Sequence, residues 1–416
     1  MLEFLTKTVR KINPKDFTLA KRGTSREINR QIALTLIHTH QPISRAGLAR
    51  LMDTNRANVT FLVNELLEEN LVREGAQGSE KVRGRKPTFL YLNSQKHFAV
   101  AVDIRASRTF LMITDALGKQ IGEVTSFATE ADPHKFVKSL AARIRAIVGT
   151  KLEASNCEGI GIVVPGMLDR QSNVVLHAPT LGWRDVDLLA PLQKEFDGIK
   201  VHLENSGKAC ALSQIWTTRT DGIGYNDLVF VSVSDGVGVG IVINGELIRG
   251  RHNTAGEFGH VPLSIDGPPC SCGANGCWEA YISNLAMLSR YFGKNLLKRQ
   301  PQSIETAEFT IGDLISKARE GESRALTALH STARYLGLGL ASIINAVDPS
   351  CVYIGGEITE AWDLIEREVH DAIKERTLTK ELGATVVRTV PASEHPRLRG
   401  AVALVTAPAF AAPKVA

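Results

Sequence analysis

The sequence predicts a multidomain protein in which a small, basic, helical domain precedes a larger α/β region. Its 416 residues, 44% of them apolar, suffice for more than one buried core. Residues 1–94 carry 16 Lys and Arg against 9 Asp and Glu, whereas the remaining chain carries 33 against 35. Near His97 the hydrophobic pattern changes from helical spacing to strands that alternate with glycine turns and helices. We therefore expect a first domain over residues 1–95 and an α/β region with a mixed sheet after it.

Export and membrane insertion are not expected. Charged residues at Glu3, Lys7 and Arg10 interrupt the apolar positions of the N-terminus, so it lacks the apolar core of a signal peptide. No segment approaches the roughly 18 consecutive apolar residues that span a bilayer. We expect a cytoplasmic protein that does not contact a membrane. Residues 1–25 are compatible with a short amphipathic helix, an arm that packs on a dimer, or disorder.

The first domain is expected to begin with two helices. Residues 26–40 carry apolar side chains at helical spacing and predict the first helix. Ser44 precedes a second, short helix and is a good N-cap residue, with Leu48 and Leu51 expected to face inward.

A third helix follows the polar turn at residues 53–55. Its apolar residues repeat at i, i+3, i+4, i+7 and i+8, which predicts one buried face made of Val59, Leu62, Val63, Leu66 and Leu67. Polar side chains occupy other positions, and arginine and asparagine are suited to reading guanine and adenine in the DNA major groove. The candidate DNA-contacting residues around these two helices are Ser44, Asn55, Arg56, Asn58, Thr60 and Asn64.

Two short strands around a glycine-rich, basic tip are predicted after the third helix. The tip carries Lys81, Arg83, Arg85 and Lys86, which could place arginine in a minor groove and lysine on phosphate. Residues 84–87 read Gly-Arg-Lys-Pro, which closely resembles the Gly-Arg-Arg-Pro wing typical of the winged-helix domains of MarR-like and ROK-family repressors. The resemblance implies a winged helix-turn-helix domain that binds double-stranded operator DNA. A solvated basic surface without a partner remains the alternative for the charge alone.

Three of the six cysteines cluster near a histidine. Cys270, Cys272 and Cys277 follow His260 on a short loop rich in glycine and proline. One imidazole and three thiolates are the ligand set of a closed tetrahedral zinc site, so we expect structural Zn²⁺ here. The other cysteines, which lie among apolar neighbours, are expected to be small buried core residues: Cys157, Cys210 and Cys351.

The zinc segment and most of the chain around it closely resemble the ROK family, which contains sugar kinases and sugar-responsive repressors. The resemblance rests on the histidine, Cys-x-Cys-Gly and Gly-Cys-x-Glu of residues 260–279, and on segments from residues 164 to 188 and 338 to 358. It implies an actin-like, ribonuclease-H-like fold of two α/β lobes around a sugar-binding cleft. We expect a smaller lobe over residues 96–206, completed by about 393–412, and a larger lobe over 207–392.

The resemblance also implies which residues bind sugar. Matching the family's motifs to this chain assigns sugar hydroxyls to Asn205, Glu257, His260 and Glu279. His260 would contact sugar through one ring nitrogen and zinc through the other. Backbone groups at Pro165-Gly166 and Gly182-Trp183 are expected to line the same cleft.

The catalytic residues of the kinases are altered. Where the kinases have Glu-Asn-Asp, this chain has Glu204-Asn205-Ser206, and a serine is no general base at neutral pH. Where they have a glycine-rich phosphate turn, this chain has Arg105 and Ala106, whose side chains would obstruct phosphate. We therefore expect no enzymatic activity.

The sequence thus predicts a sugar-responsive DNA-binding regulator, with repression as the family default. A sugar or sugar derivative would change the affinity of a homodimer, or a dimer of dimers, for its operator. Three alternatives stay open: an active sugar kinase that also regulates genes, a repressor controlled by a partner protein, and a sugar that promotes DNA binding. The sequence does not identify the sugar or the operator.

Overall fold

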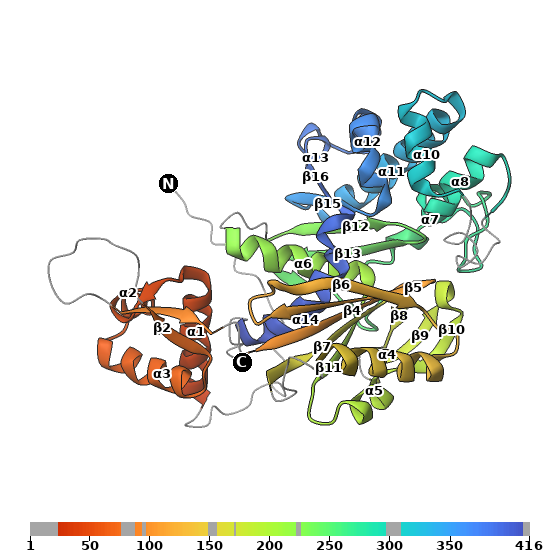
Figure 1. Cartoon of the computed structure of the whole chain (residues 1–416). Helices are drawn as coiled ribbons and strands as arrows, with labels where there is room; N and C mark the ends of the chain where they lie inside the picture. The colour runs from red at the N-terminus through yellow and green to blue at the C-terminus, as the bar shows by residue number, and fades with distance from the viewer. Residues whose placement is uncertain are drawn as a thin grey trace, which may run out of the picture. The chain divides into compact units, whose positions relative to one another are not determined.

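The computed structural model describes residues 24–75, 88–93, 97–148, 156–169, 172–221, 226–296 and 309–410. The chain divides into two compact units, one made of residues 1–93 with 408–416 and the other of residues 94–407 (Figure 1). Each unit has its own hydrophobic interior. The domain boundaries expected at residues 95, 206 and 392 stay predictions.

The smaller unit is built on three helices, at the positions that the hydrophobic pattern predicted. They are α1 (Thr24–His40), α2 (Arg45–Leu51) and α3 (Arg56–Glu68). Val59, Leu62, Val63 and Leu66 of α3 are buried, as expected, and Leu67 is half-buried.

The inward face of α2 differs from the expectation. Leu48 and Ala49 are buried, but Leu51 is 49% exposed. Successive helical residues are about 100° apart, so Leu51 lies about 110° from the middle of the Leu48–Ala49 face. Its placement in the core was therefore wrong.

Side-chain contacts fix the start of two of these helices. The hydroxyl of Ser44 accepts a hydrogen bond from the Gly47 N–H at 3.1 Å, and Asn55 Oδ1 accepts one from the Asn58 N–H at 2.9 Å. Each bond satisfies a main-chain donor that a helix N-terminus leaves unpaired.

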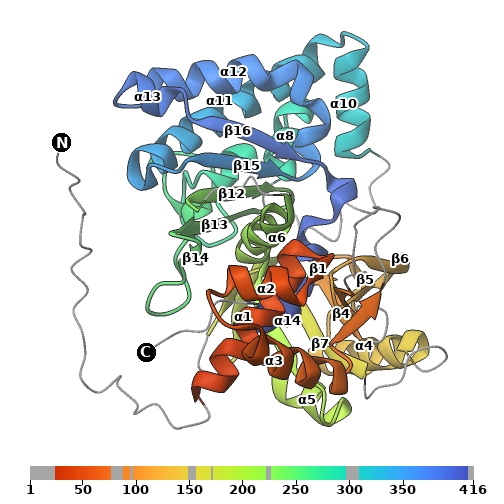
Figure 2. The same ribbon diagram turned by 90° about the vertical axis from the view of Figure 1, so that its left-hand side faces the viewer.

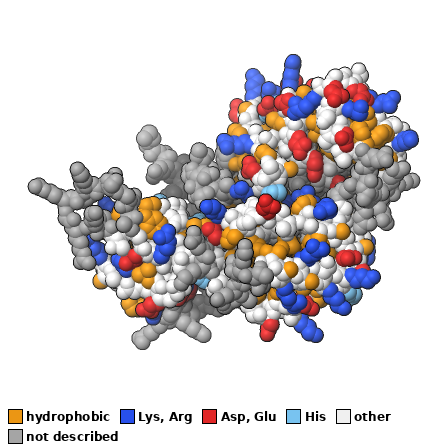
Figure 3. Space-filling model, in the orientation of Figure 1, with side chains coloured by type: hydrophobic (Ala, Val, Ile, Leu, Met, Phe, Trp, Pro, Cys, Tyr) orange, Lys and Arg blue, Asp and Glu red, His pale blue; other side chains and the backbone are white. Residues whose placement is uncertain are grey.

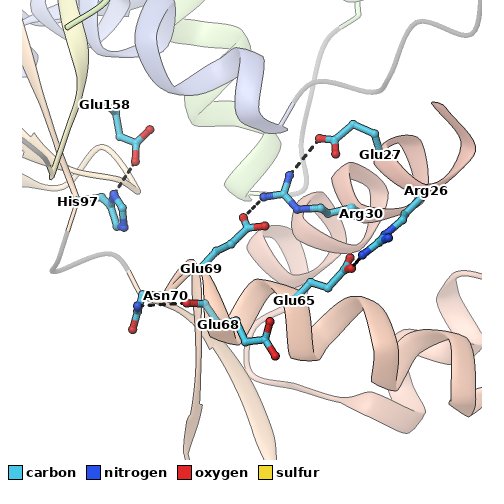
Figure 4. Close-up of polar contacts among 9 residues, drawn as sticks. All are labelled: Arg26, Glu27, Arg30, Glu65, Glu68, Glu69, Asn70, His97 and Glu158. Atoms are coloured by element: carbon cyan, nitrogen blue, oxygen red, sulfur yellow. Dashed lines mark hydrogen bonds and ion pairs between the residues drawn. The ribbon is translucent and has the colours of Figure 1, made fainter. Parts of the chain in front are cut away.

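Ion pairs join α1 to the far end of α3. Figure 4 shows Arg26 directed at Glu65, and Arg30 between Glu27 and Glu69. Because most of these side chains are at least partly solvated, each pair contributes at most about 1 kcal/mol, and the buried apolar residues supply most of the stability.

A small antiparallel sheet completes this unit. Its strands are β1 (Ile43–Ser44), β2 (Val72–Gly75) and β3 (Phe89–Leu92), in the order β1-β3-β2. β2 and β3 are the two strands that the sequence predicted around a basic tip, and they pair from Val72 with Leu92 to Gly75 with Phe89. The tip itself, with Lys81, Arg83, Arg85 and Lys86, lies outside the described residues.

The larger unit contains two five-stranded sheets with the same plan. In each, three antiparallel strands come first, a fourth strand then pairs parallel with the first of them, and a fifth pairs parallel with the fourth. The resulting orders are β11-β7-β4-β5-β6 and β14-β13-β12-β15-β16. The first sheet contains β4 (Phe98–Ile104), β5 (Arg108–Asp115), β6 (Gln120–Ala128), β7 (Cys157–Val164) and β11 (Val201–Asn205). The second contains β12 (Leu228–Val233), β13 (Val237–Ile243), β14 (Glu246–Leu247), β15 (Cys351–Gly355) and β16 (Val386–Val390). The expected α/β architecture with mixed sheets is confirmed.

Helices cover both faces of both sheets (Figures 1 and 2). Between the sheets lie α6 (Ser206–Asp221) and α14 (Pro396–Phe410). The outer face of the first sheet packs on α4 (Pro133–Val148) and α5 (Leu189–Glu195). The outer face of the second packs on α8 (Asn284–Phe292), α10 (Ile311–Arg319), α11 (Ser323–Val347) and α12 (Trp362–Arg376).

The remaining elements are short. They are a three-stranded sheet of β8 (Met167–Leu168), β9 (Val174–Ala178) and β10 (Trp183–Asp187), and the helices α7 (Glu279–Ile282) and α13 (Lys380–Gly383). On the face drawn in Figure 3, positive and negative side chains are interspersed over the larger unit, in keeping with its near-zero net charge. Within the described ranges, no helix combines the length and the apolarity needed to cross a membrane.

Candidate functional site

The two sheets of the larger unit direct the ends of their central strands toward one cavity. It has a volume of about 270 Å³. Residues that directly follow β4, β7, β11, β12 and β15 line it: Arg105, Ala106, Pro165, Gly166, Ser206, Ser234, Asp235, Gly236 and Glu357. The cavity is therefore a product of the topology, because ligand sites in open α/β sheets form outside the carboxyl ends of the strands.

The structure brings the expected sugar-binding side chains together. Asn205, Glu257, His260 and Glu279 all line the cavity, together with Gly166. They come from the end of β11, the segment that follows β14, and the first residue of α7, so more than 70 residues separate the first from the last.

Asn205 connects two walls of the cavity. Its Oδ1 accepts a hydrogen bond from the Gly207 N–H at 2.8 Å, and its Nδ2 donates to the Gly166 carbonyl at 2.6 Å. Gly166 has a φ of 105°, and a Cβ there would lie 2.3 Å from the His177 carbonyl oxygen. Only glycine is compatible with both the backbone angle and the close approach. The amide thus holds the backbone of Gly166 in the wall.

A buried lysine lies beside Glu257. Lys208, in the first turn of α6, is 1% exposed and donates a hydrogen bond from Nζ to the Asn253 carbonyl at 2.9 Å. Burial lowers the pKa of Lys208, while the charges of Glu204 and Glu257 oppose that effect. Burial raises the pKa of Glu257, and Lys208 and His260 lower it. Glu257 is therefore a half-buried acceptor with a buried cation, Lys208, nearby.

Glu257 is free to accept from a ligand. Among the described residues, neither of its carboxylate oxygens has a hydrogen-bond or ion-pair partner, although the residue lines the cavity. The half-buried carboxylate is therefore available to a molecule that supplies hydrogen-bond donors. The hydroxyl groups of a polyol supply such donors.

Glu279 is oriented by the protein itself. One carboxylate oxygen accepts a hydrogen bond from the Val237 N–H at 2.9 Å, and the other accepts one from the Ser271 hydroxyl at 3.0 Å. Val237 begins β13 after the glycine turn, and Ser271 lies between two cysteines of the loop. The carboxylate therefore joins the glycine turn to the cysteine loop at the wall of the cavity.

The expected contribution of Gly182 and Trp183 to the cavity was wrong. Neither residue lines it, and Pro179 and Thr180 take that place. Trp183 is 2% exposed in the core under the first sheet, and its indole N–H donates to the Ala131 carbonyl at 2.8 Å. A Gly-Trp pair can line a ligand site or pack in a hydrophobic core, and the sequence alone does not distinguish the two positions.

The side of the cavity next to β4 is occupied by side chains. Arg105 pairs with the fully buried Asp103 at 2.8 Å and lies over the ring of Phe110, 4.6 Å from its centroid. Ala106 is 3% exposed and also lines the cavity. Ser206 has the position after Asn205, so the wall there offers a hydroxyl and no carboxylate.

Three charged residues of this side escaped the sequence analysis. Asp235 and Glu357 line the cavity with Arg397, which donates a hydrogen bond to the Ser234 hydroxyl at 2.7 Å. Burial raises the pKa of Asp235, and the nearby charge of Glu357 raises it further. In the sequence, Asp235 and Glu357 are marked only by their position beside glycine turns. Lys208, which the sequence analysis also missed, is marked only as a cation among small and apolar residues.

Two glycines of β13 pack closely on the start of α6. A Cβ on Gly240 would lie 2.4 Å from the Gly207 carbonyl oxygen, which leaves no room for a side chain. A Cβ on Gly238 would lie 3.1 Å from the Gly207 N and would require a small shift of that residue. Gly240 is therefore required by the packing of β13 on α6.

The four expected metal ligands form one cluster. Single atoms of His260, Cys270, Cys272 and Cys277 all lie within 4.8 Å of one another. The distance between the Cys272 and Cys277 sulfurs is 3.7 Å, and that between Cys270 Sγ and His260 Nδ1 is 3.6 Å. A tetrahedron with Zn–S of about 2.3 Å and Zn–N of about 2.05 Å requires about 3.8 Å and about 3.6 Å. The donor set and its spacing fit Zn²⁺.

Main-chain hydrogen bonds shape the cysteine loop into a small hairpin. The Cys270 N–H donates to the Ala274 carbonyl at 2.8 Å, and Trp278 N donates to the Val261 carbonyl at 2.9 Å. The Trp278 side chain is 1% exposed in the core of the second sheet and donates to the Tyr335 carbonyl at 2.9 Å. The loop is thus anchored at one end by an aromatic residue, while its tip has few apolar contacts.

Burial raises the pKa of the Cys277 thiol and, to a larger extent, that of Cys270. A bound divalent cation would reverse this tendency, because it stabilises the thiolate directly. Of the remaining cysteines, Cys210 and Cys351 are buried as expected, with pKa values raised to about 12 and about 11, whereas Cys157 is only half-buried.

In the smaller unit, the candidate DNA-contacting residues of α3 are exposed: Arg56, Asn58, Thr60 and Asn64. Several of their polar atoms already have partners. Thr60 donates to the Arg56 carbonyl at 2.8 Å, Asn58 donates to the Thr54 hydroxyl at 3.2 Å, and Asn64 Oδ1 accepts from Arg45 at 3.2 Å. Ser44 and Asn55 are helix caps. Their expected role as base contacts would have to coexist with these bonds.

Comparison with known proteins gives a family match over most of the chain. The model of the ROK family matches residues 99–407. The xylose repressor of Bacillus spizizenii is 30% identical over 362 residues, which is 86% of this chain and 89% of that protein. The DNA-binding transcriptional dual regulator NagC of Escherichia coli is 26% identical over 383 residues, 91% of this chain and 92% of that protein.

Solved structures agree on the fold. A ROK family transcriptional regulator described as a homolog of the E. coli MLC protein superposes with a TM-score of 0.77 at 23% identity, over 93% of this chain and 98% of its own. A ROK family glucokinase from Streptomyces griseus, in complex with glucose and AMPPNP, superposes with a TM-score of 0.63 at 25% identity, over 74% of this chain and 98% of its own. The regulator therefore matches nearly the whole chain, and the kinase about three quarters of it.

Proposed function

This chain belongs to the ROK family, and on that basis we propose that it is a sugar-responsive, DNA-binding transcriptional regulator whose kinase-like unit binds a sugar without phosphorylating it. One observation carries the proposal. Asn205, Glu257, His260 and Glu279 line a single cavity, and Ser206 takes the place of the catalytic base in the same wall. The site keeps groups that accept and donate hydrogen bonds to hydroxyls, and lacks the group that would activate one.

The sugar-binding roles follow from the geometry of each side chain. Glu257 offers two unpaired carboxylate oxygens to neighbouring hydroxyls, and Asn205 adds an amide that its bond to Gly166 holds in place. His260 Nδ1 faces Cys270, so the other ring nitrogen, Nε2, is left to contact the ligand. Glu279, whose carboxylate already contacts Val237, Ser271 and Cys270, contributes shape and a further acceptor position at the oxygen that faces Val237.

Bound Zn²⁺ would be a structural ion. His260, Cys270, Cys272 and Cys277 would fill all four positions of a tetrahedral site, which leaves none for water or substrate. When bound, the ion stabilises the thiolates and fixes the tautomer of His260. The protein's own contribution is to hold the loop next to Glu279, through the Ser271 bond.

Phosphoryl transfer is disfavoured at three points. Ser206 is not a general base, and the loss of that function alone costs about 100-fold to 10,000-fold in rate. Arg105 and Ala106 cover the first phosphate turn. Asp235 and Glu357 add negative charge where the phosphates of a nucleotide would lie.

The smaller unit supplies DNA binding. α2, the turn at residues 52–55 and α3 would form a helix-turn-helix, with the basic tip between β2 and β3 as the wing. A regulator that binds operator DNA acts where the chromosome lies, so we place the protein in the cytoplasm of a bacterium. A homodimer, or a dimer of dimers, would present paired copies of α3 to a palindromic operator.

The effector is proposed to be a pentose or hexose, or a derivative of one. The relatives are named xylose repressor and N-acetylglucosamine repressor, which makes xylose and N-acetylglucosamine the first candidates. Sugar binding alters DNA affinity only through its different affinity for the two states of the protein, and couplings of about 1–3 kcal/mol are usual. We expect the sugar to weaken operator binding.

The test is a thermal-shift screen of zinc-loaded protein against xylose, glucose, fructose, N-acetylglucosamine, N-acetylmannosamine and their phosphates. A stabilisation of several degrees that Glu257→Ala abolishes is the expected result. Stabilisation that survives Glu257→Ala would place the sugar elsewhere. No stabilisation by any sugar would favour control by a partner protein, and ADP release with a sugar and ATP would favour an active kinase. An increase in operator affinity on sugar addition would reverse the direction of control.

A further inference from the structure

The exposed face of α3 has an apolar centre. Val59, Leu62, Val63 and Leu66 are buried, and on a helix with about 100° per residue the direction opposite to them passes between Ala57 and Phe61. Both side chains are exposed, and Phe61 retains 55% of its surface. Phe61 therefore presents an apolar ring on the outermost line of the helix, where it is accessible to a partner.

Phe61 is held in place from one side. The guanidinium of Arg26 lies over its ring, 4.9 Å from the centroid, and Arg26 in turn pairs with Glu65, the contact drawn in Figure 4. An aromatic ring has few rotatable bonds, and this contact restricts them further. Phe61 is thus presented as an ordered apolar group and not as a loose side chain.

Two polar neighbours of Phe61, Thr60 and Asn64, already form hydrogen bonds within the unit. The hydroxyl of Thr60 donates to the Arg56 carbonyl, and the carbonyl oxygen of the Asn64 side chain accepts from Arg45. On this part of α3, the centre of the exposed face is therefore the apolar pair Ala57 and Phe61, in the first two turns of the helix, with Arg26 contacting Phe61 from one side.

We propose that Ala57 and Phe61 contact the C5-methyl groups of thymines in the operator. The inference rests on the proposed DNA-binding function and extends it to the base that this face selects. Thymine methyls are the apolar groups that base edges present in the major groove, and the N-terminal residues of a recognition helix are those that reach base edges. Residues 1–94 as a whole have 16 basic against 9 acidic side chains, which favours a polyanion as the partner of this domain.

The experiment uses the full-length, zinc-loaded protein. Its operator is obtained by repeated selection from a random-sequence duplex library, and each thymine is then replaced by deoxyuridine, which removes only the methyl group. We expect one or two thymines in each half-site at which the replacement weakens binding about fourfold, the worth of one buried methyl. The Phe61→Ala substitution should weaken binding to the thymine operator. The Phe61→Ala protein should then bind the thymine and deoxyuridine operators with equal affinity.

Two variants separate contact from folding. Phe61→Leu keeps an apolar side chain and should retain part of the preference for thymine. Leu51→Ala removes the 49%-exposed leucine at the end of α2 and should leave the preference unchanged. Circular-dichroism melting of the variants checks that the helical unit is intact.

The outcomes are distinct. A deoxyuridine operator that binds as well as the thymine operator at every position overturns this inference, and so does a fourfold preference that persists in Phe61→Ala. Both leave DNA binding itself in place. Failure of the protein to enrich any sequence overturns the proposed function and this inference together.

Discussion

The carboxylate of Glu279 accepts a hydrogen bond from the main-chain N–H of Val237, 2.9 Å away. The first residue of α7 thereby holds the turn that begins β13. The other oxygen of Glu279 accepts from the Ser271 hydroxyl in the cysteine loop. One side chain therefore connects the cysteine loop to the glycine turn. The metal cluster and the far wall of the cavity are coupled at this residue.

Glu279→Ala should destabilise the larger unit. It removes the acceptor of the part-buried Val237 N–H and that of Ser271, and a buried unpaired donor costs about 1–3 kcal/mol. We expect a lower midpoint in urea unfolding and weaker sugar binding. Glu123→Ala, at an exposed position of β6, should change neither. Unchanged stability in Glu279→Ala would mean that these two bonds contribute nothing net.

The metal cluster should bind one zinc ion per chain. Cys272→Ser removes one of the four donors, so we expect loss of zinc by mass spectrometry and a lower thermal midpoint of the larger unit. Cys157→Ser, in β7, is the matched control and should keep its zinc. A full zinc content in Cys272→Ser would contradict the assignment of ligands.

Asp235→Asn should stabilise the protein at neutral pH. The pKa of Asp235 is raised from its ordinary 3.8, mainly by burial and then by Glu357, so the folded state binds this proton more tightly than the unfolded state does. The ionised carboxylate therefore costs stability at pH 7, and the cost disappears as the pH falls toward 3.8.

We expect the stability gained by Asp235→Asn, measured by urea unfolding, to shrink between pH 7 and about pH 4, near the ordinary pKa of the carboxyl group. The exposed Asp197→Asn should leave the curve unchanged. A gain that is the same at both pH values would show that some contact other than the charge is responsible.

Lys208→Met should be strongly destabilising although it preserves the aliphatic stem. The ammonium lies buried near Glu204 and Glu257, and removal of one member of a buried charge group costs about 3 kcal/mol. The double variant Lys208→Met with Glu257→Gln should recover part of the loss, because it also removes the unbalanced carboxylate. Strictly additive losses in a double-mutant cycle would rule out an interaction between the two groups.

Ser206→Asp should not create a sugar kinase. The variant restores a carboxylate at the position of the general base, but Arg105, Ala106, Asp235 and Glu357 still line the phosphate side. We expect ADP release with glucose or xylose to stay at the level of the unmodified protein. Turnover in Ser206→Asp would mean that the base was the only missing part.

Features set by neighbouring residues could be predicted from the sequence. The caps at Ser44 and Asn55, the buried face of α3 and the cysteine loop after His260 all depend on spacings of a few residues. Helix periodicity and ligand spacing act over that range, so one chain suffices to recognise them. The sugar-binding assignments followed from the family resemblance, and the structure brings them to one cavity.

Only the tertiary structure decided what else surrounds that cavity. Asp235, Glu357 and Arg397 come from three places spread over more than 160 residues, and no local pattern indicates that they meet. Packing likewise sent Trp183 into a core and left Leu51 and Phe61 exposed. The sequence shows which side chains are apolar or charged. Which face of a helix or strand becomes buried depends on contacts with elements that are distant in the sequence. The chemistry of the individual groups was therefore determined by the sequence, and their encounter by the fold.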